Sequence, residues 1–221
     1  MPSQISIVRG TTTNSYSLVP TPVCPAPRSI TYTASDAVAT VKSEFSNATQ
    51  TQYWPGADLR SWTVNLPPMQ RSDAAQWFAF LMSLRGQAYV FQMGDPDGAQ
   101  PQGNPSGAPA VDGSVSTNNT PGSNVLYTTG WTPSTYRLLL PGDYLQIGYR
   151  LYNVVESPVD SDANGAAQIN IWPSLREQPA GGTAITLAST QGLFRLADNT
   201  RQWSYDVAQA YGISFRIVEA I

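Results

Sequence analysis

The feature that most constrains the fold is a succession of short strand-like segments, separated by turn residues, in the second half of the chain. They read VLYTTGW, YRLLL, YLQIGYRLYNVVES, AAQINIWP and TAITL. Strands of about five residues at this spacing are typical of a small barrel or sandwich. We therefore expect a small β domain after residue 124.

The stretch before these segments has a different composition. Residues 94–124 consist mainly of Gly, Pro, Ser and Asn and have almost no large apolar side chains. Such a stretch predicts a linker or an extended loop, and we interpret it as a domain boundary. The length of 221 residues fits either one large β-rich domain or two small ones.

The first part of the chain also has strand chemistry. Residues 1–29 predict an extended arm or edge strand, because prolines interrupt them at Pro2, Pro20, Pro22, Pro25 and Pro27. Residues 29–45 alternate β-branched and polar side chains, with a bend expected at Ser35-Asp36. Residues 59–66 predict a further strand, with Trp62 and Val64 sharing one face.

One segment has helical periodicity. We expect a helix with Ser72 as the N-cap, Asp73 in the first turn and Gly86 at the C-terminal end. An apolar stripe, widened by Phe78 and Phe80, follows the helical spacing at Ala74, Trp77, Leu81 and Leu84. A stripe this broad predicts that a sheet covers the helix.

The end of the chain predicts strands again. In the last one, apolar and polar positions alternate at Ile213, Ser214, Phe215, Arg216 and Ile217. We expect the strands within residues 203–221 to pair with strands near residues 30–65 and 87–93.

The absence of histidine excludes much enzyme chemistry. It removes Ser-His-Asp and Cys-His catalysis and histidine-based zinc sites. Cys24 is the single cysteine and lies in a proline-rich loop, so we expect an inert thiol. Carboxylate catalysis remains, but acidic residues concentrate in turns at Asp95, Asp97, Asp143, Asp160 and Asp162. We expect no enzyme activity and no catalytic, cofactor-binding or metal-binding residues.

The charge pattern limits the partners. The net charge is −3, charged residues make up 12% of the chain, and Lys42 is the only lysine. Nucleic-acid binding and polybasic membrane attachment both need clustered basic residues, so we expect neither partner. The N-terminal residues have no features of a secretory signal, which predicts folding in the cytosol. A weakly charged surface suits a subunit packed among others or a secreted binding module.

The motif DSDANG resembles a calcium loop at Asp160, Asp162, Asn164 and Gly165. The twelfth position is Ile171 rather than glutamate, and Asn164-Gly165 is a strong hairpin signal. We favour a turn, with calcium binding as the alternative.

Two stretches of the chain carry distinctive motifs. The first has Trp54-Pro55-Gly56, Leu66-Pro67-Pro68-Met69, and a helix with Trp77 and Ala79-Phe80-Leu81. The second has Gly142-Asp143, Gly148, Arg150-Leu151-Tyr152, Val154, Asp162, Gly165, Ala167, Pro173, Leu175 and Arg176. Together the two stretches cover about half of the chain, and in content and order they resemble a broad group of phage minor tail proteins. The resemblance is greatest to distal tail proteins of long-tailed phages.

The resemblance implies a mainly β protein, an α+β fold with one helix. A tail-tube-like β-sandwich with one flanking helix would comprise residues 1–95 and 190–221, and an inserted small β-barrel would comprise residues 103–188. It implies a homo-hexameric ring in the virion tail, assembled in the host cytoplasm. The ring would join the tail tube protein to the hub or tip proteins of the baseplate.

The main alternative is a carbohydrate-binding module that contacts a glycan of the host surface. Aromatic side chains that could stack on sugar rings are Trp131, Tyr136, Tyr144, Tyr149, Tyr152 and Trp172. Filling of the barrel or an intersubunit surface is the interpretation that we favour for them.

Overall fold

The computed structural model describes residues 3–9, 12–115, 117–205 and 210–220. Its contacts divide the chain into two compact units, which are described separately. The sheet unit comprises Met1–Ala34, Arg60–Met93 and Gly192–Ile221, and the barrel unit comprises Ser35–Leu59 and Gly94–Gln191. Pro2 of the expected N-terminal arm and residues 206–209 of the expected C-terminal strands lie outside the described residues.

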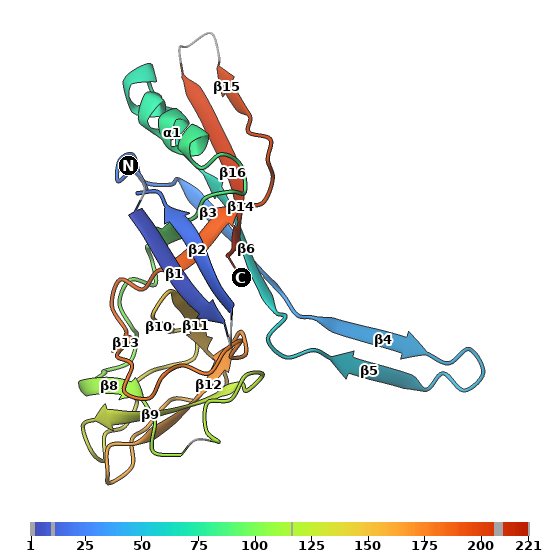
Figure 1. Ribbon diagram of the computed structural model, residues 1–221, viewed down its shortest axis with the longest axis vertical. Helices are drawn as coiled ribbons and strands as arrows, with labels where there is room; N and C mark the ends of the chain where they lie inside the picture. The colour runs from blue at the N-terminus through green and yellow to red at the C-terminus, as the bar shows by residue number, and fades with distance from the viewer. Residues whose placement is uncertain (1–2, 10–11, 116, 206–209, 221) are drawn as a thin grey trace. The chain divides into compact units, whose positions relative to one another are not determined.

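The fold is mainly β, with one helix in the described part of the chain (Figure 1). The main sheet of the sheet unit has the strand order β3-β6-β16-β14-β7, with β15 paired to β16. Its strands are β3 Ser29–Ser35, β6 Leu59–Asn65, β7 Phe91–Met93, β14 Gly192–Leu196, β15 Trp203–Tyr205 and β16 Tyr211–Glu219. The N-terminal residues form a separate hairpin of β1 Ser3–Arg9 and β2 Thr12–Leu18, where an extended arm or edge strand was expected.

Strand β16 is the centre of the main sheet. It pairs antiparallel with β6 on one side and with β14 on the other, and β14 in turn pairs with β7. Ile213, Phe215 and Ile217 are buried, whereas Ser214 and Arg216 are exposed. The expected alternation is confirmed, and so is the return of the C-terminal strand to pair with residues 59–65. The expected pairing of strands within residues 203–221 with residues 87–93 is wrong, because β14 lies between β16 and β7 in the sheet.

The helix α1, Arg71–Ser83, packs its expected stripe into the core of the sheet unit. Ala74, Trp77, Leu81 and Leu84 are all buried, and the Trp77 ring contacts Phe215 of β16. The expected N-cap is wrong: Gln70 occupies that position, and Ser72 lies inside the first turn. Met69 and Tyr211 exchange backbone hydrogen bonds of 3.2 and 2.8 Å, which fix the chain just before residue 71. This tertiary contact outweighs the local capping preference of Ser72.

The barrel unit contains a six-stranded sheet with the order β13-β10-β11-β12-β9-β8. The strands are β8 Gly107–Val111, β9 Val125–Trp131, β10 Tyr144–Ile147, β11 Arg150–Val154, β12 Ala167–Trp172 and β13 Ile185–Thr186. The two ends of the sheet meet, because the Val111 amide donates to the Thr183 carbonyl over 2.9 Å and the Gly182 amide donates to Val111 over 2.8 Å. The sheet is therefore nearly closed into a barrel, which confirms the expected small β-barrel.

Apolar side chains of the alternating segments fill this barrel. Leu126, Leu145 and Ile169 have no exposed surface, as the inward positions of their strands require. The YRLLL segment forms no strand, although Leu138 and Leu139 are fully buried. Residues 94–124 were expected to be a loop, but they contribute strand β8. The residues of β8 are poor strand formers, and the strand forms because it pairs with β9.

The largest difference between the two units and the expected domains concerns residues 35–59. Residues 35–59 were expected in the first domain with residues 1–95, but their contacts group them with the barrel unit. The reason is a set of hydrogen bonds between residues 53–58 and residues 174–176, described below. Among the described residues, no helix is long and apolar enough to cross a membrane.

Candidate functional site

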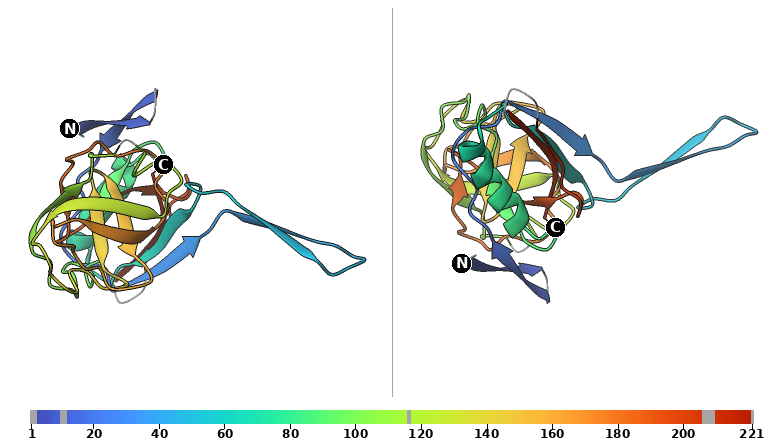
Figure 2. Two further views of the ribbon diagram at one scale, coloured as in Figure 1. Left: turned by 90° about the horizontal axis from the view of Figure 1, so that it is seen from below. Right: turned by 90° about the horizontal axis from the view of Figure 1, so that it is seen from above.

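The barrel unit carries a two-stranded hairpin that no other strand of the described chain supports. It is formed by β4 Val38–Lys42 and β5 Thr49–Tyr53, which pair only with each other (Figure 1). Every side chain of β4 and all but Tyr53 of β5 are exposed. We call residues 38–53 the arm, and Figure 2 shows its two strands as a ribbon from two further directions.

The arm's sequence explains its local structure. Its strands are rich in Val, Thr and Gln, and they contain no proline or glycine to interrupt the ladder. At the tip, the Ser43 amide donates to the Ala48 carbonyl over 2.9 Å, and Asn47 takes the left-handed conformation with φ of 55°. The strands are therefore locally well specified although nothing covers them.

The arm exposes apolar side chains on both faces. Val38 and Val41 lie on opposite faces of β4, and they are 47% and 68% exposed. Phe45 at the tip is 100% exposed. An isolated two-stranded hairpin is only marginally stable in water, and natural sheet edges are usually protected by charge, proline or a bulge. The arm thus has the properties of a surface that a partner covers.

A buried polar cluster fixes the base of the arm to the barrel. Asp58 has no exposed surface, and its Oδ2 accepts hydrogen bonds of 2.7 Å from both the Tyr53 and the Ser174 hydroxyls. The backbone amides of Ser174 and Ala37 donate to the same carboxylate over 3.4 Å each. We call Tyr53, Asp58 and Ser174 the latch.

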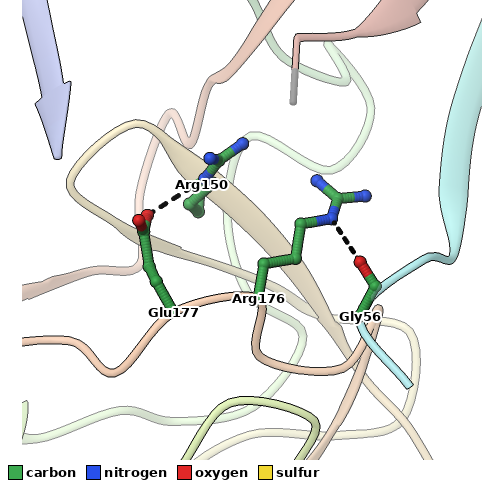
Figure 3. Close-up of polar contacts among 4 residues, drawn as sticks. All are labelled: Gly56, Arg150, Arg176 and Glu177. Atoms are coloured by element: carbon green, nitrogen blue, oxygen red, sulfur yellow. Dashed lines mark hydrogen bonds and ion pairs between the residues drawn. The ribbon is translucent and has the colours of Figure 1, made fainter. Parts of the chain in front are cut away.

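Backbone contacts reinforce the latch. The Gly56 amide donates to Ser174 Oγ over 2.9 Å. Arg176 donates from Nε to the Gly56 carbonyl over 3.2 Å (Figure 3). Its Nη2 donates to the Asp58 carbonyl. Gly56 has φ of +81°, a conformation that side chains with a Cβ rarely adopt. The Trp-Pro-Gly motif and the Pro-x-Leu-Arg motif, about 120 residues apart in sequence, therefore meet at one site.

The electrostatics of the latch favour an ionised aspartate. Burial by itself would raise the pKa of Asp58, but the hydrogen bonds from Tyr53, Ser174 and the backbone amides outweigh it and lower the pKa below its ordinary value. Burial raises the pKa of Tyr53, and the neighbouring Asp58 adds to this rise. At neutral pH the Tyr53 hydroxyl therefore stays protonated and donates to the Asp58 carboxylate.

Other motif residues also hold the barrel together. Arg150 Nε and Glu177 Oε1 form an ion pair of 3.3 Å, with side chains that are mostly buried (Figure 3). The Asp143 carboxylate accepts backbone hydrogen bonds from Gln102, Gly103 and Leu140 at 2.7, 3.2 and 2.8 Å. These contacts give both Arg150 and Asp143 a structural role.

The DSDANG segment forms a tight turn before β12. Asp162 Oδ1 accepts hydrogen bonds of 2.8 Å from the amides of Asn164 and Ala166, which lower the pKa of Asp162. Gly165 has φ of +74°, as the Asn-Gly hairpin signal predicts. Asp160 accepts from the Arg137 amide over 2.6 Å. Within the described residues, no group of three His, Cys, Asp or Glu side chains could hold a metal ion.

The six aromatic residues considered for sugar stacking do not share one environment. Trp131 and Tyr152 belong to the barrel core, and Trp131 donates to Thr128 Oγ1 over 2.8 Å. Trp172 and Tyr144 are partly buried and donate to Asp36 and Asp95 over 2.7 and 3.1 Å. Tyr149 is partly buried, and of the six only Tyr136 is mostly exposed. The core interpretation is therefore confirmed for Trp131 and Tyr152.

The remaining residues named from the sequence have simple environments. Cys24 is exposed and forms no disulfide. Asp95 accepts from the Asp97 amide over 3.0 Å, a contact typical of a turn.

Sequence reasoning did not identify the latch. It quoted Gly56 and Arg176 as motif residues but missed Tyr53, Asp58 and Ser174. Ser174 lies at the variable position of the Pro-x-Leu-Arg motif, and its bond to Asp58 joins residues 116 positions apart. A hydrogen bond between such distant residues of ordinary types has no local sequence signal.

No protein-family model matches the chain, and no curated protein sequence matches it.

Proposed function

We propose that this chain is a structural subunit of a bacteriophage tail tip, of the distal tail protein type. In this proposal it assembles as a homo-hexameric ring that joins the tail tube to the hub proteins of the baseplate. It reaches the virion tail after assembly in the host cytoplasm. It performs no catalysis and takes no cofactor.

The observation that carries the proposal is the arm. A hairpin with both faces exposed and with Val38, Val41 and Phe45 in solvent is explained most simply if another subunit covers it. The latch supports this interpretation, because it fixes the base of the arm while leaving the strands free to bind. An arm held in this way is oriented for its partner before binding, which reduces the entropy lost on association.

A ring is one of the two assemblies that a contact of this type can build. An arm on one subunit that binds a different surface of the next subunit makes a heterologous interface, and such interfaces close into rings or continue as filaments. The number six comes from the resemblance to distal tail proteins. The low charged fraction of 12% is compatible with close packing, since weakly charged surfaces repel each other little.

The solution mass of the purified chain tests this function. Light scattering over a range of protein concentrations should detect a species of about 143 kDa, six times the chain mass of 23.9 kDa. The variant Val41→Asp, which places a charge on an exposed face of the arm, should shift the population to monomers. The control Val115→Asp changes an exposed valine outside the arm, 47% exposed against 68% for Val41, and should leave the mass unchanged. A wild-type chain that remains monomeric at every concentration would contradict the proposal.

A further inference from the structure

A hollow lies beside β16 on the sheet unit, between the points where β14 and β15 pair with that strand. The pairing of β14 ends opposite Ile217, and the pairing of β15 begins opposite Ile213. The six residues 197–202 between the two strands therefore lie opposite only the three residues 214–216 of β16. A segment with this excess of residues cannot stay in the sheet. Figure 1 shows it as a loop that leaves β14 and returns at β15, and we call it the β14–β15 loop.

Two side-chain hydrogen bonds hold the β14–β15 loop against the end of α1 and the residues that follow it. Asn199 Oδ1 accepts from the Gln87 amide over 3.1 Å, and Arg201 Nη1 donates to the Leu81 carbonyl over 3.0 Å. The packing is close, because a Cβ at Gly86 would lie 2.5 Å from Asn199 Oδ1. The wall of the hollow is thus fixed before any ligand binds, which reduces the entropy lost on binding.

The hollow has the size of a pocket for a small ligand. Its volume is about 360 Å³, and pockets for small molecules typically measure roughly 300–1,000 Å³. Part of its wall is apolar and is formed by Leu81, Leu196 and Phe215. Another part carries hydroxyl and amide groups, from Thr200, Gln202 and Ser214. Such a wall suits a ligand with an apolar body and a polar group.

The charges of the hollow are predominantly positive. Arg201, Arg216 and Asp198 line it, so two guanidinium groups stand against one carboxylate, although the chain as a whole has a net charge of −3. Among the described residues, neither guanidinium forms an ion pair with a carboxylate. A guanidinium has five N–H donors, and the Leu81 carbonyl takes only one from Arg201. Donors for an anion therefore remain at the wall.

We propose that the hollow binds a carboxylate ligand with a small apolar body, attracted by the positive charge of Arg201 and Arg216. The planar guanidinium fork matches the geometry of a carboxylate. A ligand with one negative charge balances the excess of one positive charge in the hollow, whereas a phosphate group carries nearly two negative charges. The inference is independent of the proposed function, because the hollow lies within the sheet unit of a single chain.

Saturation-transfer NMR tests this proposal, because it detects weak ligands on a protein in any state of assembly. The first probe is N-acetyl-leucine, which has a free carboxylate and an apolar side chain. The second probe is N-acetyl-leucine amide, which has the same body without the charge. The wild-type chain should transfer saturation to the acid and much less to the amide. Equal transfer to both probes would overturn the proposal.

The variant Arg216→Gln locates the binding site. It removes one guanidinium and leaves the bond between Arg201 and α1 in place, so circular dichroism should match the wild type. Binding of N-acetyl-leucine should weaken about 10-fold or more, as expected for a lost hydrogen bond to a charged group. The matched control Arg28→Gln removes an exposed guanidinium of the same unit outside the hollow and should bind as the wild type does. If the two variants bind equally well, the hollow is not the site.

The variant Asp198→Asn should have the opposite effect. It removes the one carboxylate that lines the hollow, so N-acetyl-leucine should bind about twofold more tightly. An affinity that stays the same or falls would contradict the role given to the charges.

Further probes identify the source of the carboxylate. The peptide acetyl-Gly-Gly-Leu presents the same terminal leucine on a longer chain. Tighter binding of this peptide than of N-acetyl-leucine supports the carboxy terminus of a protein as the ligand, and equal binding supports a free small carboxylate. Inorganic phosphate should displace N-acetyl-leucine less readily than acetate does. The reverse order would show a phosphate site and would refute the proposal.

Discussion

Replacing Ser174 by alanine removes the hydroxyl at the centre of the latch. In the wild-type chain this hydroxyl donates to Asp58 Oδ2 over 2.7 Å and accepts from the Gly56 amide over 2.9 Å. Ser174 is 1% exposed, so water cannot easily replace it. The substitution therefore affects a charged acceptor and a backbone donor together.

The magnitude follows from these two contacts. A hydrogen bond to a charged group contributes about 1.5–3 kcal/mol, and a buried donor left without a partner costs about 1–3 kcal/mol. The two losses are not fully additive, because Tyr53 still donates to Asp58 and Gly56 is only partly buried. We expect Ser174→Ala to lower the free energy of unfolding of the barrel unit by about 3 kcal/mol.

Urea unfolding followed by circular dichroism measures this loss, and Ser106→Ala is the matched control. The Ser106 hydroxyl lies in the same unit and is buried without a hydrogen-bond partner in the described structure, so its removal should cost almost nothing. Hydrogen exchange adds a local measurement, because the Gly56 amide should exchange faster in Ser174→Ala alone. If Ser174→Ala is as stable as Ser106→Ala and Gly56 exchanges as in the wild type, the latch does not fix the arm.

Two further substitutions test other contacts of the barrel unit. Asp58→Asn should lower stability at pH 7 by about 1.5–3 kcal/mol. The folded-state pKa of Asp58 lies below its unfolded value of about 3.9. The extra stability of the wild type over Asp58→Asn is therefore complete above about pH 3.9 and is lost as the pH falls through the folded-state pKa. Melting temperatures of the two proteins, measured from pH 7 to pH 2, should converge, and parallel curves would contradict the assignment. Gly165→Ala should cost at least twice as much as Gly148→Ala, for which about 1–2 kcal/mol of left-handed strain is expected. Both glycines have positive φ, but a Cβ at Gly165 would lie 2.3 Å from the Trp131 carbonyl oxygen. A Cβ at Gly148 would have no atom within 4 Å. Equal unfolding free energies of the two variants in urea would disprove the close contact at Gly165.

Local periodicity was sufficient to predict much of the fold. The alternation in β16 and the apolar stripe of α1 appear at the expected residues, because each follows from burial of one face of a regular element. The Asn164-Gly165 turn was predictable for a similar reason, since few residues adopt its conformation. In these elements the local preference and the tertiary structure agree.

Other features depend on contacts between distant residues. The start of α1 is set by the bridge between Met69 and Tyr211 rather than by Ser72. Strand β8 contains Gly107 and Pro109 and forms through its pairing with β9. The latch joins Asp58 to Ser174 across the chain, which is why residues 35–59 belong with the barrel. Sequence patterns record the faces of elements, but they do not record which distant polar groups will meet.

Electron microscopy of the purified chain tests the central claim most directly, because the claim concerns a closed ring of identical subunits. Negatively stained particles of the wild-type chain should show rings with six-fold rotational symmetry, and Phe45→Ser should reduce their number. Open filaments, rings of another symmetry, or single subunits alone would contradict the account.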